Sequence, residues 1–353
     1  MLKSGLKNIH IMVIVILLSY ALLSYPGTVT NGVTRGLTLC AAVVIPSLFP
    51  FMVLSSFIVK SGLCSKFGFL FDPVTRTLFK LPGNAAGVVF MSLIGGFPVG
   101  PKMTYELYEN GEISKSQARM MMFFCMNAGP AFVLSAVGYS MYNSSKVGLI
   151  LFASICASSI IVGVVTSIFD NDKEKEFLSH SREKKAQPDN LTAFTYSVSD
   201  GANSILSVCI WVVIFSCIGS LLELLPIEPK VLIALKSILE VTSGVNSAAH
   251  HFSIPSIAFI LGWSGLCVHC QVMQYIQKVG APLFKFWLSR LANATIASVI
   301  CSALLDLYPV DIPTMASPDR LFDASLSVSA PGAAVLLSMC ALLILDLDTK
   351  RKV

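Results

Sequence analysis

Two short stretches rich in helix-breaking residues interrupt long apolar segments, and they constrain the fold more than any other feature. The first, IGGFPVGPK, runs from Ile94 to Lys102, and the second, ILGWSGL, runs from Ile260 to Leu266. Glycine weakens a helix, and proline removes a backbone donor and clashes with the preceding turn. The backbone groups freed in this way cannot face lipid, so they need protein or a water-filled cavity around them. Paired interruptions of this kind are typical of transporter substrate sites.

The length and polarity of the apolar segments predict an all-α, polytopic membrane protein. Only 13% of the 353 residues are charged, whereas a soluble domain carries about a quarter. Several apolar runs exceed about 18 residues, the length that is typical of a membrane span. The net charge of +5 does not indicate nucleic acid, because no basic block with interleaved aromatic residues occurs and the basic residues lie at the ends of apolar runs. The sequence therefore predicts a multi-pass membrane protein in contact with the lipid bilayer.

An internal repeat relates the two interrupted stretches. Shifting the sequence by 166 positions, from 96 to 262, places Gly96 on Gly262 and Asn127 on Asn293. The second match extends over the pattern N-A-x-x-A-x-V, with no gap between the glycines and the asparagines. Repeats are common in transporter folds, in which they are often inverted. We therefore predict two homologous repeats in inverted orientation, each with a broken or re-entrant helix.

The apolar runs and one polar stretch of mixed charge divide the chain. The predicted segments are an N-terminal membrane helix and loop (1–36), a first repeat (37–169), a polar linker (170–199), a second repeat (200–310), and an acidic loop with a C-terminal membrane helix (311–353). Within the repeats, spans are predicted from about Leu37 to Val59, with a kink at Pro46 and Pro50, and from about Arg119 to Tyr139. A weaker helix is predicted from Val231 to Ala249.

Both breaks supply free backbone groups, and the helix after each break directs its N-terminus toward them. Such a helix end is suited to a carboxylate or a phosphate. The predicted substrate contacts are Gly96, Pro98 and Gly100 in the first break and Gly262, Ser264 and Gly265 in the second. Lys102, where the first break meets its helix, is a candidate anion partner. The alternative is a lysine that extends to the membrane surface and anchors the helix end.

Polar residues within the apolar segments extend the candidate site. Asparagine in a span is costly unless it is hydrogen-bonded, and the repeat pairs Asn127 with Asn293. We predict that both asparagines contact substrate, together with Gly129 beside the first. The alternative is that they form interhelical hydrogen bonds or helix caps.

A glutamate, a serine and a glutamine complete the predicted contacts. Glu240 precedes a Thr-Ser-Gly sequence that includes Ser243, and it could bind substrate or couple the movement of a proton or cation. The alternative is a local ion pair with Lys236, four residues earlier. Gln271, which follows the second break, is predicted either to line a cavity or to cap the break.

Metal binding and catalysis are not indicated. Cys267, His269 and Cys270 form half of a metal site, but no second Cys/His pair lies at zinc-site spacing, so we interpret them as packing residues. The sequence contains no nucleophile–base constellation and no nucleotide-binding or metalloprotease motif. We predict no enzyme activity, no cofactor and no metal.

Several sequence blocks resemble the sporulation integral membrane protein YlbJ family, which has a "gate" domain of the nucleoside-recognition type. The blocks are LIGGFPVGPK, NGEIS, FCMNAGPAFV, LEVTSG, FILGWSGLCVHCQ and FWLSR, and they cover about residues 35–310 in order. Two departures from the family pattern are Pro101 before Lys102 and the cysteine-rich stretch after Gly265.

This resemblance implies a protein of endospore-forming bacteria that lies in the cell membrane or the outer forespore membrane. It implies transport of dipicolinic acid, a small planar dianion, with nucleosides or other small metabolites as the alternative substrates. Other sporulation membrane proteins are implied as partners, and a homo-oligomer is left open. A non-transporting membrane scaffold for spore assembly is the competing function, although a scaffold has no evident need for matched polar breaks.

Overall fold

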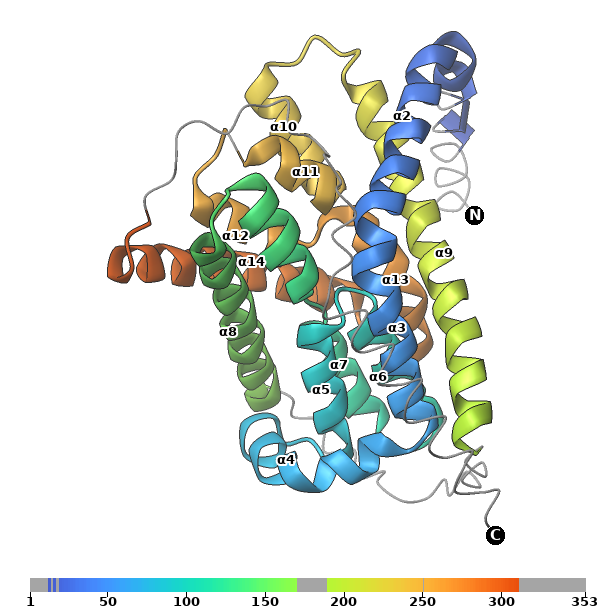
Figure 1. The fold of residues 1–353 in the computed structure, drawn as a ribbon, viewed down its shortest axis with the longest axis vertical. Coiled ribbons are helices and arrows are strands. Elements are labelled where there is room, and N and C mark those ends of the chain that lie inside the picture. Colours follow the sequence, from blue (N-terminus) through green and yellow to red (C-terminus); the bar gives the residue numbers. More distant parts are fainter. Residues whose placement is uncertain (1–11, 14, 17–18, 170–188, 250, 311–353) are drawn as a thin grey trace, which may run out of the picture.

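The computed structural model of the chain describes residues 12–13, 15–16, 19–169, 189–249 and 251–310. Every regular element in these residues is a helix (Figure 1). Five helical segments are long and apolar enough to cross a membrane, or six if one bent pair counts as a single span. The predicted all-α, polytopic membrane class is therefore confirmed. The predicted C-terminal membrane helix and residues 170–188 of the predicted linker lie outside the described residues.

The first long helix begins earlier than predicted. It starts at Pro26 rather than near Leu37 and runs through α2 (Pro26–Leu39), the π-helical turn η1 (Cys40–Val44) and α3 (Ile45–Lys60). Proline suits the first turn of a helix, because its missing N–H has no partner there in any case. The π turn ends two residues before Pro46, a residue that cannot donate to the preceding turn. The predicted kink at Pro46 and Pro50 stays a prediction, and Pro26–Lys60 counts as one candidate span.

The first predicted break is confirmed, and a further bend precedes it. Helix α4 (Leu63–Phe79) is followed by α5 (Asn84–Ile94), and the segment Asp72–Phe79 lies at 81° to α5. Helix α5 ends at Ile94, and α6 (Val99–Glu109) begins after four non-helical residues. Gly96 lies in this gap with φ +87°, a conformation that favours glycine.

The predicted span from about Arg119 to Tyr139 is wrong, because the chain is interrupted inside it. Helix α7 (Lys115–Phe124) is followed by the non-helical residues 125–129, and then by the π helix η2 (Ala131–Met141). Gly129 lies in the interruption and Pro130 follows it with helical angles, because proline starts a helix well but cannot continue a previous one. Helix α8 (Ser145–Phe169) then forms an uninterrupted 25-residue span.

The second half corrects two further predictions. Helix α9 (Asn190–Leu222) begins inside the predicted linker, so residues 190–199 are helical. The single helix predicted from Val231 to Ala249 is two helices, α10 (Pro229–Leu239) and α11 (Val241–Ala248), separated at Glu240. The second predicted break is confirmed at Ser264 and Gly265, which have φ values of +77° and +73° between α12 (Ile254–Trp263) and α13 (Gly265–Val279).

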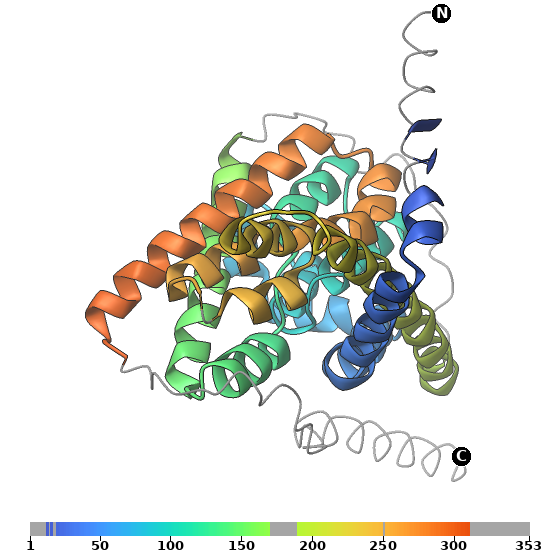
Figure 2. The ribbon, with the colours of Figure 1, turned by 90° about the horizontal axis from the view of Figure 1, so that it is seen from above.

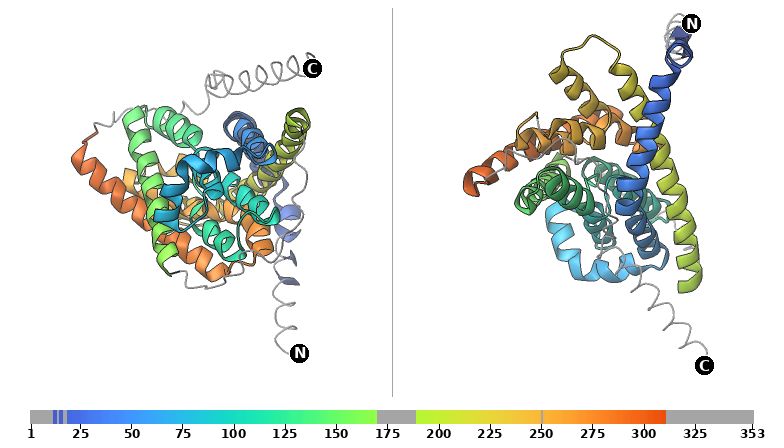
Figure 3. Two further views of the ribbon diagram at one scale, coloured as in Figure 1. Left: turned by 90° about the horizontal axis from the view of Figure 1, so that it is seen from below. Right: turned by 45° about the horizontal axis from the view of Figure 1, so that its top comes forward.

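The helices form an irregular bundle around the interrupted segments. Helices α2 and α3, which form one continuous segment, lie along α9 on one side of the bundle. Figures 1 and 3 show this segment and α9 as the longest feature of the molecule. On the other side, α14 (Leu283–Leu307) crosses α8 and α12, and its C-terminal end projects from the bundle (Figures 1 and 2). The short helices and their breaks therefore lie between two groups of long helices.

The glycines of the two breaks make similar contacts within their own halves of the chain. The backbone of Gly96 lies against Gly129, and Gly262 lies against the backbone of Asn293 and Ala294. The contacted residues are not equivalent positions of the predicted repeat, because the shift of 166 places Gly129 on Thr295. The repeat and its inverted orientation stay predictions.

Candidate functional site

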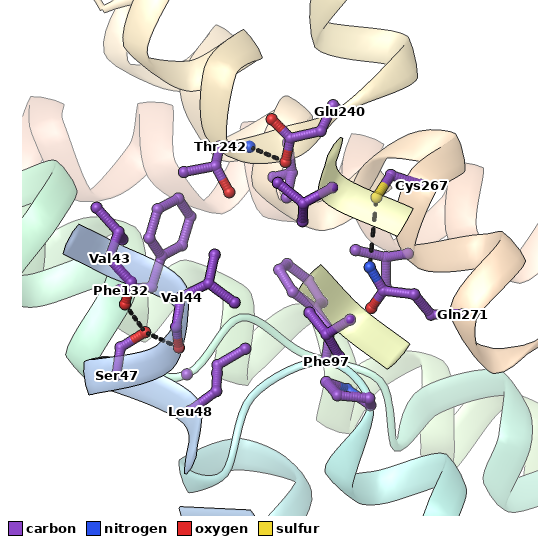
Figure 4. Close-up of a pocket in the computed structure, with 16 residues that line it drawn as sticks. Val43, Val44, Ser47, Leu48, Phe97, Phe132, Glu240, Thr242, Cys267 and Gln271 are labelled. Carbon is purple, nitrogen blue, oxygen red and sulfur yellow. Dashed lines mark hydrogen bonds between the residues drawn. The ribbon is translucent and has the colours of Figure 1, made fainter. Parts of the chain in front are cut away.

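One small cavity lies where several chain interruptions meet (Figure 4). It is lined by the first break, the interruption before η2, the junction of α10 and α11, and the start of α13, with η1, α3 and α9 completing the wall. The lining residues are Val43, Val44, Ser47, Leu48, Phe97, Pro98, Gly129, Phe132, Val208, Val212, Glu240, Val241, Thr242, Cys267, Val268 and Gln271. Its volume is about 40 Å³, which holds a few water molecules but no organic substrate.

The two interruptions on one side of the cavity are held together by backbone contacts that only glycine allows. A side chain on Gly129 would meet the nitrogen of Gly96 and the carbonyl oxygen of Ile94, each at 3.1 Å. Gly100, on the first turn of α6, packs against the Cys125 carbonyl. Of the predicted contacts in this region, Pro98 and Gly129 line the cavity, whereas Gly96 and Gly100 shape the wall behind it.

The charged group of the cavity is Glu240, and its side chain is buried, with the residue 2% exposed. Its two carboxylate oxygens accept hydrogen bonds from the backbone N–H groups of Thr242, at 2.8 Å, and Ser243, at 2.6 Å. Glu240 thus caps the N-terminus of α11, where the free N–H groups and the helix dipole stabilise negative charge. Backbone approach fixes this junction, because Gly265 lies directly against Glu240 and Val241.

The predicted ion pair between Lys236 and Glu240 is wrong. Lys236 pairs with Glu223 near the end of α9, and Arg35 of α2 binds the same carboxylate at 3.0 Å. The i,i+4 spacing fails because the helix ends at Leu239, so residues 236 and 240 do not share a helical face. Glu240 is consequently left facing the cavity without a basic partner among the described residues.

Gln271 lines the same cavity from α13, as predicted for a residue after the second break. Its amide donates to the Sγ of Cys267, 3.3 Å away and one helical turn earlier (Figure 4). Ser264 is fully buried at the break and bonds backbone carbonyls of α12 at 3.4 Å, a weak geometry. Ser264, Gly262 and Gly265 lie outside the lining of the cavity, and Ser243 contributes its backbone N–H to Glu240.

A second, smaller cavity of about 20 Å³ adjoins the first. The two share Pro98, Val208 and Gln271 in their walls, and Lys102, Ser204 and Tyr275 also line the second. Together the cavities define a line of polar groups from Glu240 through Gln271 to Lys102. The second cavity lies between α3, α6, α9 and α13.

The Lys102 side chain is only 12% exposed and makes its polar contacts within the protein. Both interpretations of this residue stay predictions. Its ammonium lies 2.8 Å from Asp200 Oδ2 and donates to the Ser204 hydroxyl at 2.8 Å, both on α9. Lys60 of α3 lies 3.0 Å from the same Asp200 oxygen, which also accepts from Ser56 at 2.7 Å. We call Lys60, Lys102, Glu106 and Asp200 the charged cluster. It ties α6 and α3 to α9 at the end of the second cavity.

Glu106 is the fourth member of the charged cluster, on α6 outside the segments that qualify as spans. Its Oε1 is 4.0 Å from the Lys102 ammonium, and its Oε2 is buried without a hydrogen-bond partner. Burial raises the pKa of the Glu106 carboxyl from 4.5 to about 7, although the nearby Lys102 ammonium acts in the opposite direction.

The structure brings the two asparagines of the repeat to the same helix but places them outside both cavities. Asn127 donates to the Ser159 hydroxyl at 3.1 Å and to the Phe124 carbonyl at 3.2 Å. Asn293 accepts from the hydroxyl of Ser158, the adjacent residue of α8. These are interhelical hydrogen bonds of the kind that the alternative interpretation described. A role in substrate contact stays a prediction.

Because neither side chain lines a cavity, the contacts favour the alternative interpretation, under which Asn127→Leu and Asn293→Leu leave membrane insertion and any transport within about twofold of the parent. Each amide makes good bonds through one atom and leaves the other buried atom unpaired. A membrane hydrogen bond is worth only about 0.6 kcal/mol, so the melting temperature should fall slightly. Thermal unfolding and vesicle uptake measure the two effects. Loss of uptake with an unchanged melting temperature would instead establish the asparagines as substrate contacts.

The structure reveals a buried arginine that the sequence patterns did not single out. Arg290 of α14 is 0% exposed and donates to the carbonyls of Met126, at 2.6 Å, and Phe123, at 2.8 Å. These carbonyls belong to the end of α7, where helical partners are missing and the dipole favours a cation. Arg290 therefore compensates the interruption after Phe124. The sequence signals were its position inside the apolar run from Leu283 to Leu307 and at the end of the FWLSR block.

No group of three or more His, Cys, Asp or Glu residues that could hold a metal occurs in the described part of the chain. His269 bonds the Trp263 carbonyl at 2.9 Å and packs edge-on against Trp263 and Phe286. Cys267 receives the Gln271 amide. These contacts agree with the interpretation of the cysteine-rich stretch as packing.

The fold and the cavities define an integral, multi-pass α-helical membrane protein whose interrupted helices meet at a mainly apolar cavity with a few polar groups. Residues 41–145 match the family model Gate, described as nucleoside recognition, and this match contains the first break and the interruption before η2. The chain is also 24% identical over 330 residues to sporulation integral membrane protein YlbJ of Bacillus subtilis (strain 168), covering 81% of this chain and 80% of that protein. The predicted resemblance to the YlbJ family is confirmed. No solved structure matches the chain.

Proposed function

We propose that this chain is a membrane transporter for a small organic anion and that the two adjoining cavities are its closed substrate pathway. The observation that carries the proposal is the convergence of three chain interruptions and the first turns of α13 on one cavity with a buried carboxylate, Glu240. Non-helical backbone inside a membrane bundle is tolerated where it lines a cavity, and in transporters it forms substrate sites.

Transport requires the cavities to open, since their present volumes of about 40 and 20 Å³ admit only water. The interruptions at residues 95–98 and 125–129, at Glu240 and at Ser264 provide non-helical joints around the cavity. Short helices joined in this way can tilt without unfolding, and hinge residues at element ends absorb such changes. The sequence contains no nucleotide-binding motif, so we propose that a gradient of substrate, protons or cations drives the movement.

We propose dipicolinate as the first candidate substrate, following the family resemblance, and the outer forespore membrane as the location. Lys102 lines one end of the pathway, where it and Lys60 share the carboxylate of Asp200. Glu240 supplies negative charge at the other, and a dianion beside an ionised Glu240 is unfavourable. We therefore propose that the anion passes Glu240 together with a proton or a cation. Other sporulation membrane proteins and a second copy of the chain stay proposed partners.

A nucleoside is the second candidate substrate, and two observations favour it. The matching family model is described as nucleoside recognition. In addition, Phe97 and Phe132 line the cavity beside Glu240, which combines aromatic surfaces with an acceptor for hydroxyl groups. A neutral nucleoside would also avoid the charge conflict with Glu240.

Uptake by purified protein tests the proposal. Vesicles containing the full chain should accumulate labelled dipicolinate above empty vesicles, and excess unlabelled dipicolinate should suppress the signal. If unlabelled nucleosides compete and labelled nucleosides accumulate instead, the second candidate is the substrate. Absence of uptake of both compounds by folded, inserted protein would contradict transport and favour a scaffold.

A further inference from the structure

The charged cluster contains a lysine with two carboxylate neighbours on different helices. Lys102 of α6 lies 2.8 Å from Asp200 of α9 but 4.0 Å from Glu106, one turn further along α6 itself. The bond to Asp200 joins two helices, whereas a bond to Glu106 would stay within one. The choice of partner therefore decides whether α6 is tied to α9 beside the second cavity.

Asp200 has a second cationic neighbour besides Lys102. Lys60 lies 3.0 Å from its Oδ2, and Ser56 donates to the same oxygen at 2.7 Å. If Glu106 is ionised, the four groups can form two separate pairs, Lys60 with Asp200 and Lys102 with Glu106. If Glu106 is neutral, both lysines share Asp200, which is the arrangement in the structure.

Glu106 is placed to change its protonation state. Its side chain is 17% exposed, and Oε2 is buried and unpartnered. The ionisable groups that interact with it are Lys102 and Glu109 on α6, Lys60 on α3, Asp200 on α9 and Tyr275 on α13. Helix α5 carries no ionisable side chain, and Lys115 and Arg119 of α7 lie beside Gly280 instead.

We propose that Glu106 is a proton-binding site that controls the tie between α6 and α9 and thereby the opening of the second cavity. Loss of the Glu106 proton to water creates a carboxylate that draws Lys102 away from Asp200, and proton uptake restores the interhelical pair. The tie needs no assumption about substrate, but its role as a gate rests on the proposed transport function.

The direction of the pH response follows from the raised pKa of Glu106. Below about pH 7 the carboxyl is protonated, Lys102 stays with Asp200, and the cavity is closed. Above about pH 7 the carboxylate competes for Lys102, and the cavity opens. Between pH 6 and pH 8 the ionised fraction of a group with this pKa rises roughly tenfold.

Accessibility of a buried position in the second cavity tests the proposal without a substrate. Ser55 of α3 lines this cavity and is 3% exposed. In Ser55→Cys protein, a water-soluble methanethiosulfonate reagent should label the introduced thiol only when the cavity opens. Peptide-resolved mass spectrometry separates this site from the native cysteines. The labelling rate of Ser55→Cys protein at pH 8 is divided by its rate at pH 6, and the same ratio is measured for Ser55→Cys/Glu106→Gln. The first ratio should exceed the second by roughly tenfold.

Three further variants fix the interpretation. Glu106→Gln mimics the protonated side chain and should stay poorly labelled at both pH values. Asp200→Asn removes the interhelical partner and should be labelled rapidly at both. Glu109→Gln, the matched acidic control one turn further on α6, should keep the pH response. The proposal is overturned if the Glu106→Gln background responds to pH as strongly as its parent, or if labelling falls as the pH rises.

The same vesicles separate this inference from the transport proposal. A pH-dependent labelling response without uptake of any substrate would support the proton site and contradict transport. Uptake with labelling that does not depend on Glu106 would support transport and contradict the proton site.

Discussion

Gly100→Ala should prevent the accumulation of folded protein. The added Cβ would lie 2.7 Å from the Ser92 Cβ and closer still to the carbonyl oxygen of Cys125. The Cys125 carbonyl is backbone at an interruption held by several other contacts, so it cannot move away as a flexible side chain would. We expect a destabilisation of more than about 3 kcal/mol, the upper end for overpacked sites. The fraction of monodisperse protein after detergent extraction and its melting temperature measure the effect.

Gly219→Ala is the matched control for this substitution. Gly219 lies in α9, and no atom lies within 4 Å of the position that its Cβ would take. Alanine is the better helix former by about 1 kcal/mol, so this variant should melt at or above the temperature of the parent. Equal melting of Gly100→Ala and the parent would show that the interruption after α7 is more mobile than the packing in this structure.

The helix breaks that local sequence encodes were predictable, because glycine and proline disrupt the helical turn in which they lie. Gly96 with Pro98, and Ser264 with Gly265, break the chain where the sequence predicted. The span predicted over Asn127 was wrong even though Gly129 and Pro130 were visible, because a long apolar run was weighted above two breakers. The structure shows that the backbone carbonyls at this break need hydrogen-bond donors, and Arg290 of α14 provides them.

The break at Glu240 could not be read from local sequence. Leu239, Glu240 and Val241 have no strong preference against a helix, and the i,i+4 spacing from Lys236 favoured one. The interruption depends on contacts with other helices. Gly265 lies directly against the backbone of Glu240, and Gly244 packs on Ser237 of the neighbouring helix. The same limit applies to Lys102, whose partner Asp200 lies in the other half of the chain.

Glu240→Gln should reduce uptake about a hundredfold while the protein stays folded. The substitution keeps the size of the side chain but removes the charge and one of two acceptors for the N–H groups of Thr242 and Ser243. Loss of an N-terminal cap costs about 1 kcal/mol, which a protein of this size tolerates. If the carboxylate binds a proton, a cation or a substrate hydroxyl during transport, its loss should raise the barrier by about 2.7 kcal/mol, equivalent to a hundredfold in rate.

Glu223→Gln is the control that separates charge from position in this experiment. Glu223 is also acidic and near a helix end, but it pairs with Arg35 and Lys236 and lines neither cavity. We expect this variant to take up substrate at the rate of the parent. Initial uptake rates in vesicles, normalised to the amount of inserted protein, compare the two variants, and melting temperatures show whether each cap is weakened. If Glu240→Gln transports normally at an unchanged melting temperature, Glu240 only caps α11, and the substrate pathway must run outside this cavity.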